Sequence, residues 1–273
     1  MAKKEKEYKV PSRFQPFFWI GKIIIKLCVK RPTFISECGE IPDKAIICSN
    51  HAAKMGPPGI SVYYPKFAVK WGAHQMLGNY SSRFHYLRDV FYMQKRGFSK
   101  TKATLKATFE ALFSKMMYRV MKFIGTYPDV RFIKTLKASV KVLDANMNVI
   151  IFPENSNEGY KTVLTEFFPG FVMLAERYYK MRGEDVPMYP MYYEVKRRLM
   201  IVGKPIYFGK LSSEGKCREE IAEIMKEKVN ELYFKYVEKS PAPKIPAHCD
   251  EPCEIAAEEL AAEVCAPEAA AKE

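Results

Sequence analysis

His51 is the side chain of this sequence with the clearest setting for acid–base chemistry. It follows the apolar run Ala45–Cys48 and the pair Ser49-Asn50. Because an imidazole has a pKa of ~6.5, it can accept and return a proton near neutral pH. The pattern predicts a strand that ends just before His51 and presents it as a candidate general base. A single histidine at a strand end is also a common structural residue, and that alternative stays open.

Three further segments place polar side chains beside apolar runs. They are GTYPDVR at 125–131, FPENSNEG at 152–159 and VPMYP at 186–190. In an open α/β sheet, ligands gather beyond the carboxyl ends of the strands. We therefore expect these segments and His51 to converge on one crevice.

The order and spacing of these four segments resemble the motifs of the glycerolipid acyltransferase family, the lysophosphatidic-acid-acyltransferase-like enzymes. The resemblance covers residues 40–210 and rests on Asn50-His51, Gly125 through Arg131, the run from Phe152 to Asn157, and Val186-Pro187 through Pro190. Four motifs in order are more specific than any one of them alone. The sequence departs from the family at two positions: Gly56 stands where the first motif has Asp, and Asn157 where the third has Arg.

The resemblance implies acyl transfer without a metal or a redox cofactor. A fatty acyl group would move from acyl-CoA or acyl-carrier protein to a hydroxyl of a lysophospholipid or a glycerol-phosphate-like acceptor. His51 would be the general base, and Glu154 is a candidate to orient it in place of the missing Asp. The alternative is a non-catalytic lipid- or acyl-thioester-binding relative that lost the His/Asp pair.

The same resemblance implies a set of acceptor-binding side chains. Arg131 would bind a phosphate through its bidentate guanidinium, although an ordinary surface ion pair is the alternative. Glu154 could equally cap a turn. The remaining predicted contacts come from the first and third motifs: Asn50, Lys54, Asn155, Ser156 and Asn157.

Alternating helices and short apolar strands must position these residues. Hydrophobic periodicity predicts helices at 101–124, 132–145, 167–182 and 217–238. Strands are predicted at 45–48, 61–71, 148–152, 186–193 (broken by Pro190) and 198–208, and a short strand or a turn is predicted at 124–131. This alternation predicts an α/β fold with a single mixed, partly parallel sheet flanked by helices.

The segment 14–32 predicts a basic amphipathic helix. Lys22, Lys26 and Lys30 are spaced four residues apart among large apolar residues. The apolar stretch is too short and too interrupted by lysine to span a bilayer, which needs ~20 apolar residues. A helix lying in a membrane interface and a core-packing helix with a solvated lysine face both fit this pattern.

The charge of the chain is large and unevenly distributed. The formal net charge is +13, while residues 239–273 hold 8 acidic and 3 basic residues. A basic body favours an anionic partner, and we expect a membrane surface. The aromatic and cationic stretch 83–98 suits membrane or acyl-chain contact better than nucleic acid, because no nucleic-acid-binding signature accompanies it.

Three regions follow from these patterns: a basic amphipathic membrane-interface segment at 1–35, an acyltransferase-like α/β domain at 36–239, and an acidic Ala/Pro/Glu-rich flexible tail at 240–273. The seven scattered cysteines form no disulfide framework, and no secretory signal pattern is present. We therefore expect a cytoplasmic protein, peripheral on the inner face of the membrane.

Overall fold

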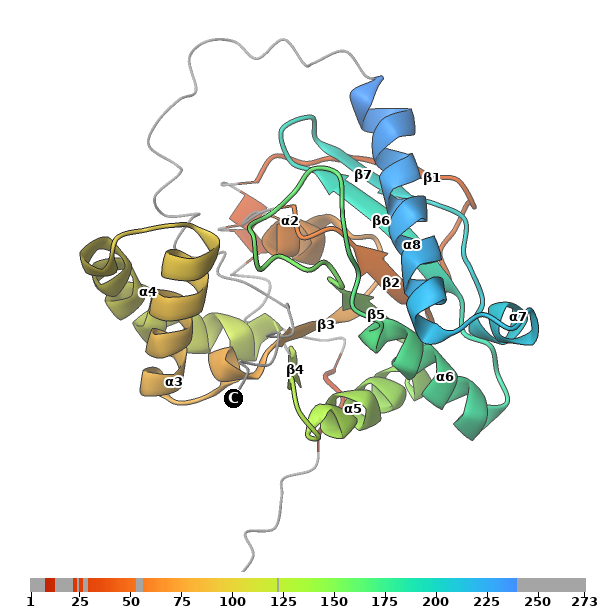
Figure 1. Ribbon diagram of the computed structural model, residues 1–273, viewed down its shortest axis with the longest axis horizontal. Coiled ribbons are helices and arrows are strands. Elements are labelled where there is room, and N and C mark those ends of the chain that lie inside the picture. The colour runs from red at the N-terminus through yellow and green to blue at the C-terminus, as the bar shows by residue number, and fades with distance from the viewer. Residues whose placement is uncertain are drawn as a thin grey trace, which may run out of the picture.

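The protein is built around one seven-stranded sheet (Figure 1). The computed structural model describes residues 8–12, 22–23, 25–26, 29–52, 56–121 and 123–239. The strand order across the sheet is β1-β7-β6-β2-β5-β3-β4. The strands are β1 (Thr33–Ser36), β2 (Ile46–Ser49), β3 (Ala68–Ala73), β4 (Ile124–Thr126), β5 (Asn148–Ile151), β6 (Met188–Glu194) and β7 (Leu199–Val202).

The sheet is parallel except where β6 pairs with β7. β2 is central, with Ile47 opposite Ile150 of β5 on one side and Tyr189 of β6 on the other. Because β2, β5, β3 and β4 all run in the same direction, their carboxyl ends meet along one edge. This confirms the predicted α/β class with a single mixed, mostly parallel sheet.

Helices cover both faces of the sheet. Adjacent residues of a strand point to opposite faces, and Tyr193 lies against Gly59 of α2 while Tyr192 lies against Tyr233, which follows α8. Thus α2 and α8 cover opposite faces, with α6 and α8 in front in Figure 1. In chain order, the helices of the described residues are α2 (Gly56–Tyr63), η1 (His74–Leu77), α3 (Tyr80–His85), π-helical η2 (Tyr86–Lys95), α4 (Lys100–Met121), α5 (Phe132–Asp144), α6 (Gly170–Arg182), α7 (Phe208–Ser213), α8 (Arg218–Leu232) and π-helical η3 (Tyr233–Glu238).

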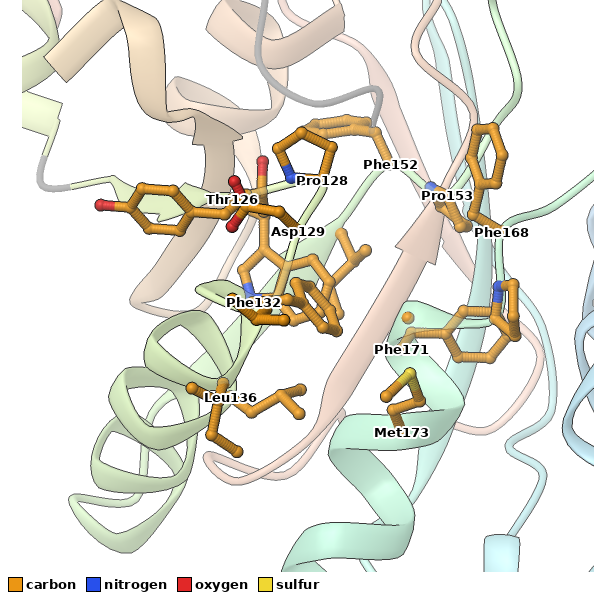
Figure 2. A pocket seen from close by; sticks show the side chains of 17 residues that line it. Thr126, Pro128, Asp129, Phe132, Leu136, Phe152, Pro153, Phe168, Phe171 and Met173 are labelled. Carbon is orange, nitrogen blue, oxygen red and sulfur yellow. The ribbon is translucent and has the colours of Figure 1, made fainter. Parts of the chain in front are cut away.

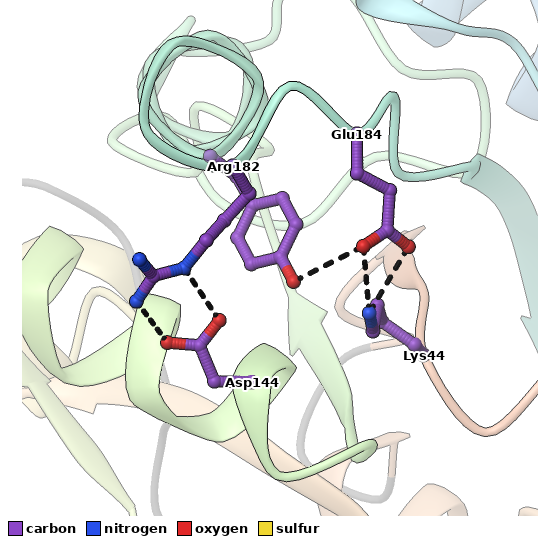
Figure 3. Close-up of polar contacts among 5 residues, drawn as sticks. Lys44, Asp144, Arg182 and Glu184 are labelled. Atoms are coloured by element: carbon purple, nitrogen blue, oxygen red, sulfur yellow. Dashed lines mark hydrogen bonds and ion pairs between the residues drawn. The ribbon is translucent and has the colours of Figure 1, made fainter.

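Two ion pairs connect α5, α6 and the start of β2 (Figure 3). Arg182 at the end of α6 donates two hydrogen bonds, of 2.9 and 2.6 Å, to Asp144 at the end of α5. Lys44, just before β2, donates to both oxygens of Glu184 at 3.0 and 2.8 Å. These contacts fix the ends of α5 and α6 relative to the start of the central strand.

Three strand predictions were wrong in detail. The strand predicted at 198–208 ends at Val202, and Phe208 begins α7. Residues 61–63 belong to α2, and the strand begins only at Ala68, because a buried apolar run does not distinguish a helix from a strand. Pro190 does not break β6. It pairs with Cys48 of β2, and its carbonyl accepts a 2.9 Å hydrogen bond from the Gly203 amide, just beyond the end of β7. Proline has no N–H to donate, and Pro190 lies where the hydrogen-bonded pairing of β6 with β7 ends, so the missing donor does not interrupt the sheet.

The stretch 83–98 was also misinterpreted. Its large side chains pack inward against α4, and Leu87, Phe91 and Tyr92 are fully or almost fully buried. The Arg96 guanidinium lies 4.7 Å from the centre of the Phe98 ring. The aromatic residues therefore build the core of the α3–η2–α4 unit and are not a contact surface for lipid.

The two ends of the chain lie largely outside the described residues. Within the predicted amphipathic segment, only Lys22, Ile23, Ile25 and Lys26 are described as helical, and the tail 240–273 is not described. β1 begins at Thr33 and so straddles the expected boundary between residues 35 and 36. No helix within the described part of the chain is long and apolar enough to cross a membrane.

Candidate functional site

His51 lies at the carboxyl end of the central strand, two residues beyond Ser49, the last residue of β2. The chain turns sharply here, and Ala52 adopts a left-handed backbone conformation with φ of 47°. The side chain of His51 is buried, with 2% of its surface exposed. The predicted strand-end position is therefore confirmed, and the imidazole lies inside the protein.

Two aromatic rings pack against the imidazole of His51. Tyr160 stacks on it with ring centres 4.7 Å apart and planes 28° apart. Phe152, which follows β5, lies tilted at 5.2 Å. Tyr160 comes from the loop beyond the third motif and shields one face of the ring. A substrate can reach that face only if Tyr160 moves.

Glu154 lies beside His51, as the adjacency of β2 and β5 requires. Its Oε2 accepts a 3.0 Å hydrogen bond from the backbone amide of His51, and its Oε1 accepts from the amide of Lys161 at 3.4 Å. Burial raises the pKa of this carboxyl, and the two backbone hydrogen bonds only partly oppose that effect. The carboxylate thus holds the turn through the backbone of His51.

Asn50 closes the end of the β2–β6 pair. Its side-chain oxygen accepts from the Tyr193 amide at 2.8 Å, and its side-chain nitrogen donates to the Tyr193 carbonyl at 3.1 Å. The amide therefore continues the backbone ladder of the sheet by one step. This contact fixes the direction in which the chain enters the His51 turn.

The third motif forms a tight turn next to Glu154. The Asn155 side chain donates to Glu166 at 2.7 Å and accepts from the Asn157 amide at 3.2 Å. The Ser156 hydroxyl is buried and, within the described residues, has no hydrogen-bond partner. The Ser156 hydroxyl is therefore a buried polar group that forms none of the hydrogen bonds that stabilise this turn.

Gly56 explains why the first motif lacks its carboxylate. Gly56 is the first residue of α2, and a Cβ built there would lie 2.0 Å from the carbonyl oxygen of His51. An aspartate at this position therefore requires the turn to shift. The backbone arrangement next to His51 therefore leaves no room for a side chain at position 56.

A second group of polar side chains follows β3 and β4. His74 Nδ1 lies 2.9 Å from the Thr126 carbonyl, and its ring stacks on Tyr127 at 4.6 Å. Arg131 donates to both oxygens of Asp129 over 2.6 to 3.0 Å and lies over the Tyr127 ring. Arg131 lowers the pKa of Asp129 to about 2. A phosphate at Arg131 would have to share the guanidinium with Asp129.

An apolar pocket is lined by residues next to both groups. Its volume is about 490 Å³, and Figure 2 shows Phe152 and Pro128 at one end and Leu136 and Met173 at the other. Phe152 lines the pocket and also contacts His51. The polar groups that line it include Thr126 and Asp129. Most of the side chains that line the space are apolar.

The structure brings together most of the residues predicted from the motifs. His51, Asn50, Glu154 and the 155–157 turn occupy adjacent strand ends, and Arg131 lies beyond β4. Lys54 lies outside the described residues. The sequence analysis singled out neither Tyr160 nor His74, although His74 directly follows β3, as His51 closely follows β2. Position after a strand was the signal that could have identified His74.

Among the residues that the structure describes, no group of three or more His, Cys, Asp or Glu side chains is arranged to hold a metal ion. In comparisons with known proteins, no family model matches the chain and no curated protein matches it.

Proposed function

We propose that this protein is a peripheral membrane acyltransferase that uses His51 as its general base. The observation that carries the proposal is the position of His51 at the carboxyl end of the central strand, in contact with Phe152, which lines the apolar pocket. The pocket would hold the acyl chain of an acyl-CoA or acyl-carrier-protein thioester. The acceptor is a lysophospholipid or a glycerol-phosphate-like alcohol.

The proposed reaction needs no group beyond the two substrates and the imidazole. His51 takes the proton of the acceptor hydroxyl as its oxygen forms a bond to the thioester carbonyl carbon. The tetrahedral intermediate then expels the thiolate by breaking the C–S bond, and the imidazolium returns the proton to sulfur. The buried Ser156 hydroxyl is a candidate donor to the developing oxyanion. Tyr160 must leave the imidazole before the acceptor binds.

The outer face of α4 supports a membrane location. Leu105, Phe109, Leu112 and Phe113 lie on one side of this helix and are 54–65% exposed. Soluble monomers rarely expose so many large apolar side chains together, and such patches commonly bind proteins or membranes. Lys102 and Lys106 are on the same helix, which suits an anionic lipid surface.

A non-catalytic lipid- or thioester-binding protein is the second candidate. Two observations favour it: Gly56 leaves no room for the usual carboxylate, and Glu154 contacts the backbone of His51. In this alternative the apolar pocket binds an acyl chain and no transfer follows.

One assay distinguishes the two functions. Purified protein is incubated with labelled oleoyl-CoA or oleoyl-acyl-carrier protein and a panel of lysophosphatidic acid, lysophosphatidylcholine and glycerol 3-phosphate. We expect transfer by the wild type and a loss of roughly 10²- to 10⁴-fold in His51→Gln. His85→Gln, which changes an exposed histidine of α3, is the matched control. Thioester binding without transfer to any acceptor would support the second function, and equal turnover in the two variants would exclude His51 as the base.

A further inference from the structure

Lys70 is a buried lysine that the proposed reaction does not use. It is the third residue of β3, and its neighbour Trp71 points to the opposite face, toward Ser139 of α5. Only 4% of Lys70 is exposed. Lysine is almost never buried to this degree unless an opposite charge or several acceptors lie against its ammonium group.

Among the described residues, no carboxylate is found paired with Lys70. Its described contacts are the face of the Phe123 ring at 5.9 Å and the charge of Lys22. Within the described residues, no hydrogen bond from its ammonium to an acidic side chain is found. The segment 13–30, which includes Lys22, contains no Asp or Glu in its sequence.

Lys70 lines a polar cavity of about 170 Å³. The cavity is lined by α2, the loop into β3, β5 and Lys22, so it lies on the α2 face, away from the apolar pocket on the α5 face. Of the other polar side chains there, Ser61 donates to the Pro57 carbonyl, Tyr64 accepts from Asn148, and Lys66 pairs with Glu40 and Asp43. Lys22 and Lys70 both line the cavity and bring positive charge to it.

We propose that Lys70 and Lys22 form a phosphate-binding site in this cavity, for a phosphate monoester carried by a lipid headgroup or by a small soluble molecule. Two lysine side chains that line one small polar cavity complement a dianion and can supply donors to its oxygens. The cavity is about a third as large as the apolar pocket and suits a headgroup rather than an acyl chain. The site is separate from His51 and does not depend on acyl transfer.

The protonation state of Lys70 predicts a second measurable effect of phosphate binding, the uptake of a proton. Burial, together with the charge of Lys22, lowers the pKa of Lys70 to about 7. Besides Lys22, the titratable groups that face it are Tyr64, whose pKa is raised by burial, and Lys66, whose pKa is raised by its acidic partners. A bound phosphate favours the charged ammonium, so at pH of about 8 binding must take up a proton.

The test uses the full chain and three variants. Calorimetric titration with inorganic phosphate, in buffers of different ionisation enthalpy, reports both affinity and proton uptake. We expect one saturable site, at least tenfold weaker binding in Lys70→Met and in Lys22→Met, and no change in Lys210→Met, an exposed lysine of α7. Proton uptake at pH of about 8 should disappear in Lys70→Met.

A second arm identifies the source of the phosphate. Sedimentation with phosphatidylcholine vesicles, with and without phosphatidic acid, is compared for the wild type and Lys70→Met. A lipid source predicts Lys70-dependent binding only to vesicles with phosphatidic acid, and competition by inorganic phosphate. A soluble source predicts calorimetric binding with no effect of Lys70→Met on vesicles. If Lys70→Met and Lys210→Met behave alike in both arms, the proposal is wrong.

Discussion

At the scale of single residues, the contact between Glu154 and His51 determines what can orient the imidazole. The carboxylate accepts from the backbone amide of His51 and from that of Lys161. Both donors belong to turns that meet at the carboxyl edge of the sheet. Glu154 therefore acts on His51 by holding its backbone, and we treat it as a positioning residue.

Replacing Glu154 should separate the loss of its charge from the loss of its hydrogen bonds. Glu154→Ala leaves two amides without their acceptor, which costs roughly 1–3 kcal/mol for each buried group. Glu154→Gln keeps one oxygen for the His51 amide, so we expect it to lose about half as much stability. Urea unfolding gives the two free energies, and the acyl-transfer assay gives the matching activities.

The pH profile of the Gln variant distinguishes a positioning role from direct proton transfer. If Glu154 acts through the backbone, Glu154→Gln lowers the rate without changing the shape of the profile. A lost or displaced ionisation in that variant would show that the carboxylate itself titrates in the reaction.

The residue-level site was predicted in part. The motif order placed His51 and Glu154 on neighbouring strand ends, because strand adjacency follows from the topology of a parallel sheet. Which atom of His51 the carboxylate would contact depends on the turn at Ala52, whose left-handed backbone no sequence pattern indicated. The steric role of Gly56 likewise depends on three-dimensional proximity to the His51 carbonyl.

At the scale of elements, α4 has an unusual distribution of side chains. Its inner face carries small residues, with Ala103, Ala107 and Ala111 fully buried, so the helix packs closely against η2 and α3. Four of its large apolar residues, Leu105, Phe109, Leu112 and Phe113, point outward. A helix stabilised only by its own protein core would show the opposite arrangement, and the exposed stripe therefore favours insertion into a lipid interface.

Removing two aromatic rings from this stripe should weaken membrane association. Burying one phenylalanine contributes about 1.5–3 kcal/mol, so Phe109→Ser with Phe113→Ser should reduce partitioning onto anionic vesicles by at least tenfold. Phe234→Ser, which removes an exposed ring from η3, is the matched control. Vesicle sedimentation measures the partitioning, and thermal unfolding checks that the fold is intact. Equal partitioning of the double variant and the wild type would show that this face of α4 does not contribute to membrane binding.

Element prediction worked where periodicity was long or the strand was flanked by clear turns. The helices α4, α5 and α6 were found within a few residues of their ends. β1 and the α3–η2 segment were missed because a four-residue strand carries little pattern and because aromatic and cationic residues alternate in 83–98. Such a mixture resembles a binding surface until its packing against α4 is known.

At the scale of the whole molecule, Lys70 couples global stability to pH. Its pKa in the folded protein, about 7, lies below its ordinary value of 10.5. Between these two values the unfolded chain holds the proton more tightly than the folded chain. The free energy of unfolding contributed by this group therefore rises with pH in that window and is lowest below pH of about 7.

Lys70→Met tests this coupling on the intact chain in phosphate-free buffer. We expect the variant to be more stable than the wild type near pH 7, with an advantage that shrinks by about 1.4 kcal/mol per pH unit as pH rises toward about 10. Lys22 and Tyr64 are present in both proteins, so their ionisation largely cancels in the difference. Urea unfolding across this range provides the measurement, and Lys210→Met should show no such slope. A pH-independent difference for Lys70→Met would mean that Lys70 remains charged in the folded protein, and the cavity would then already neutralise it without a bound phosphate.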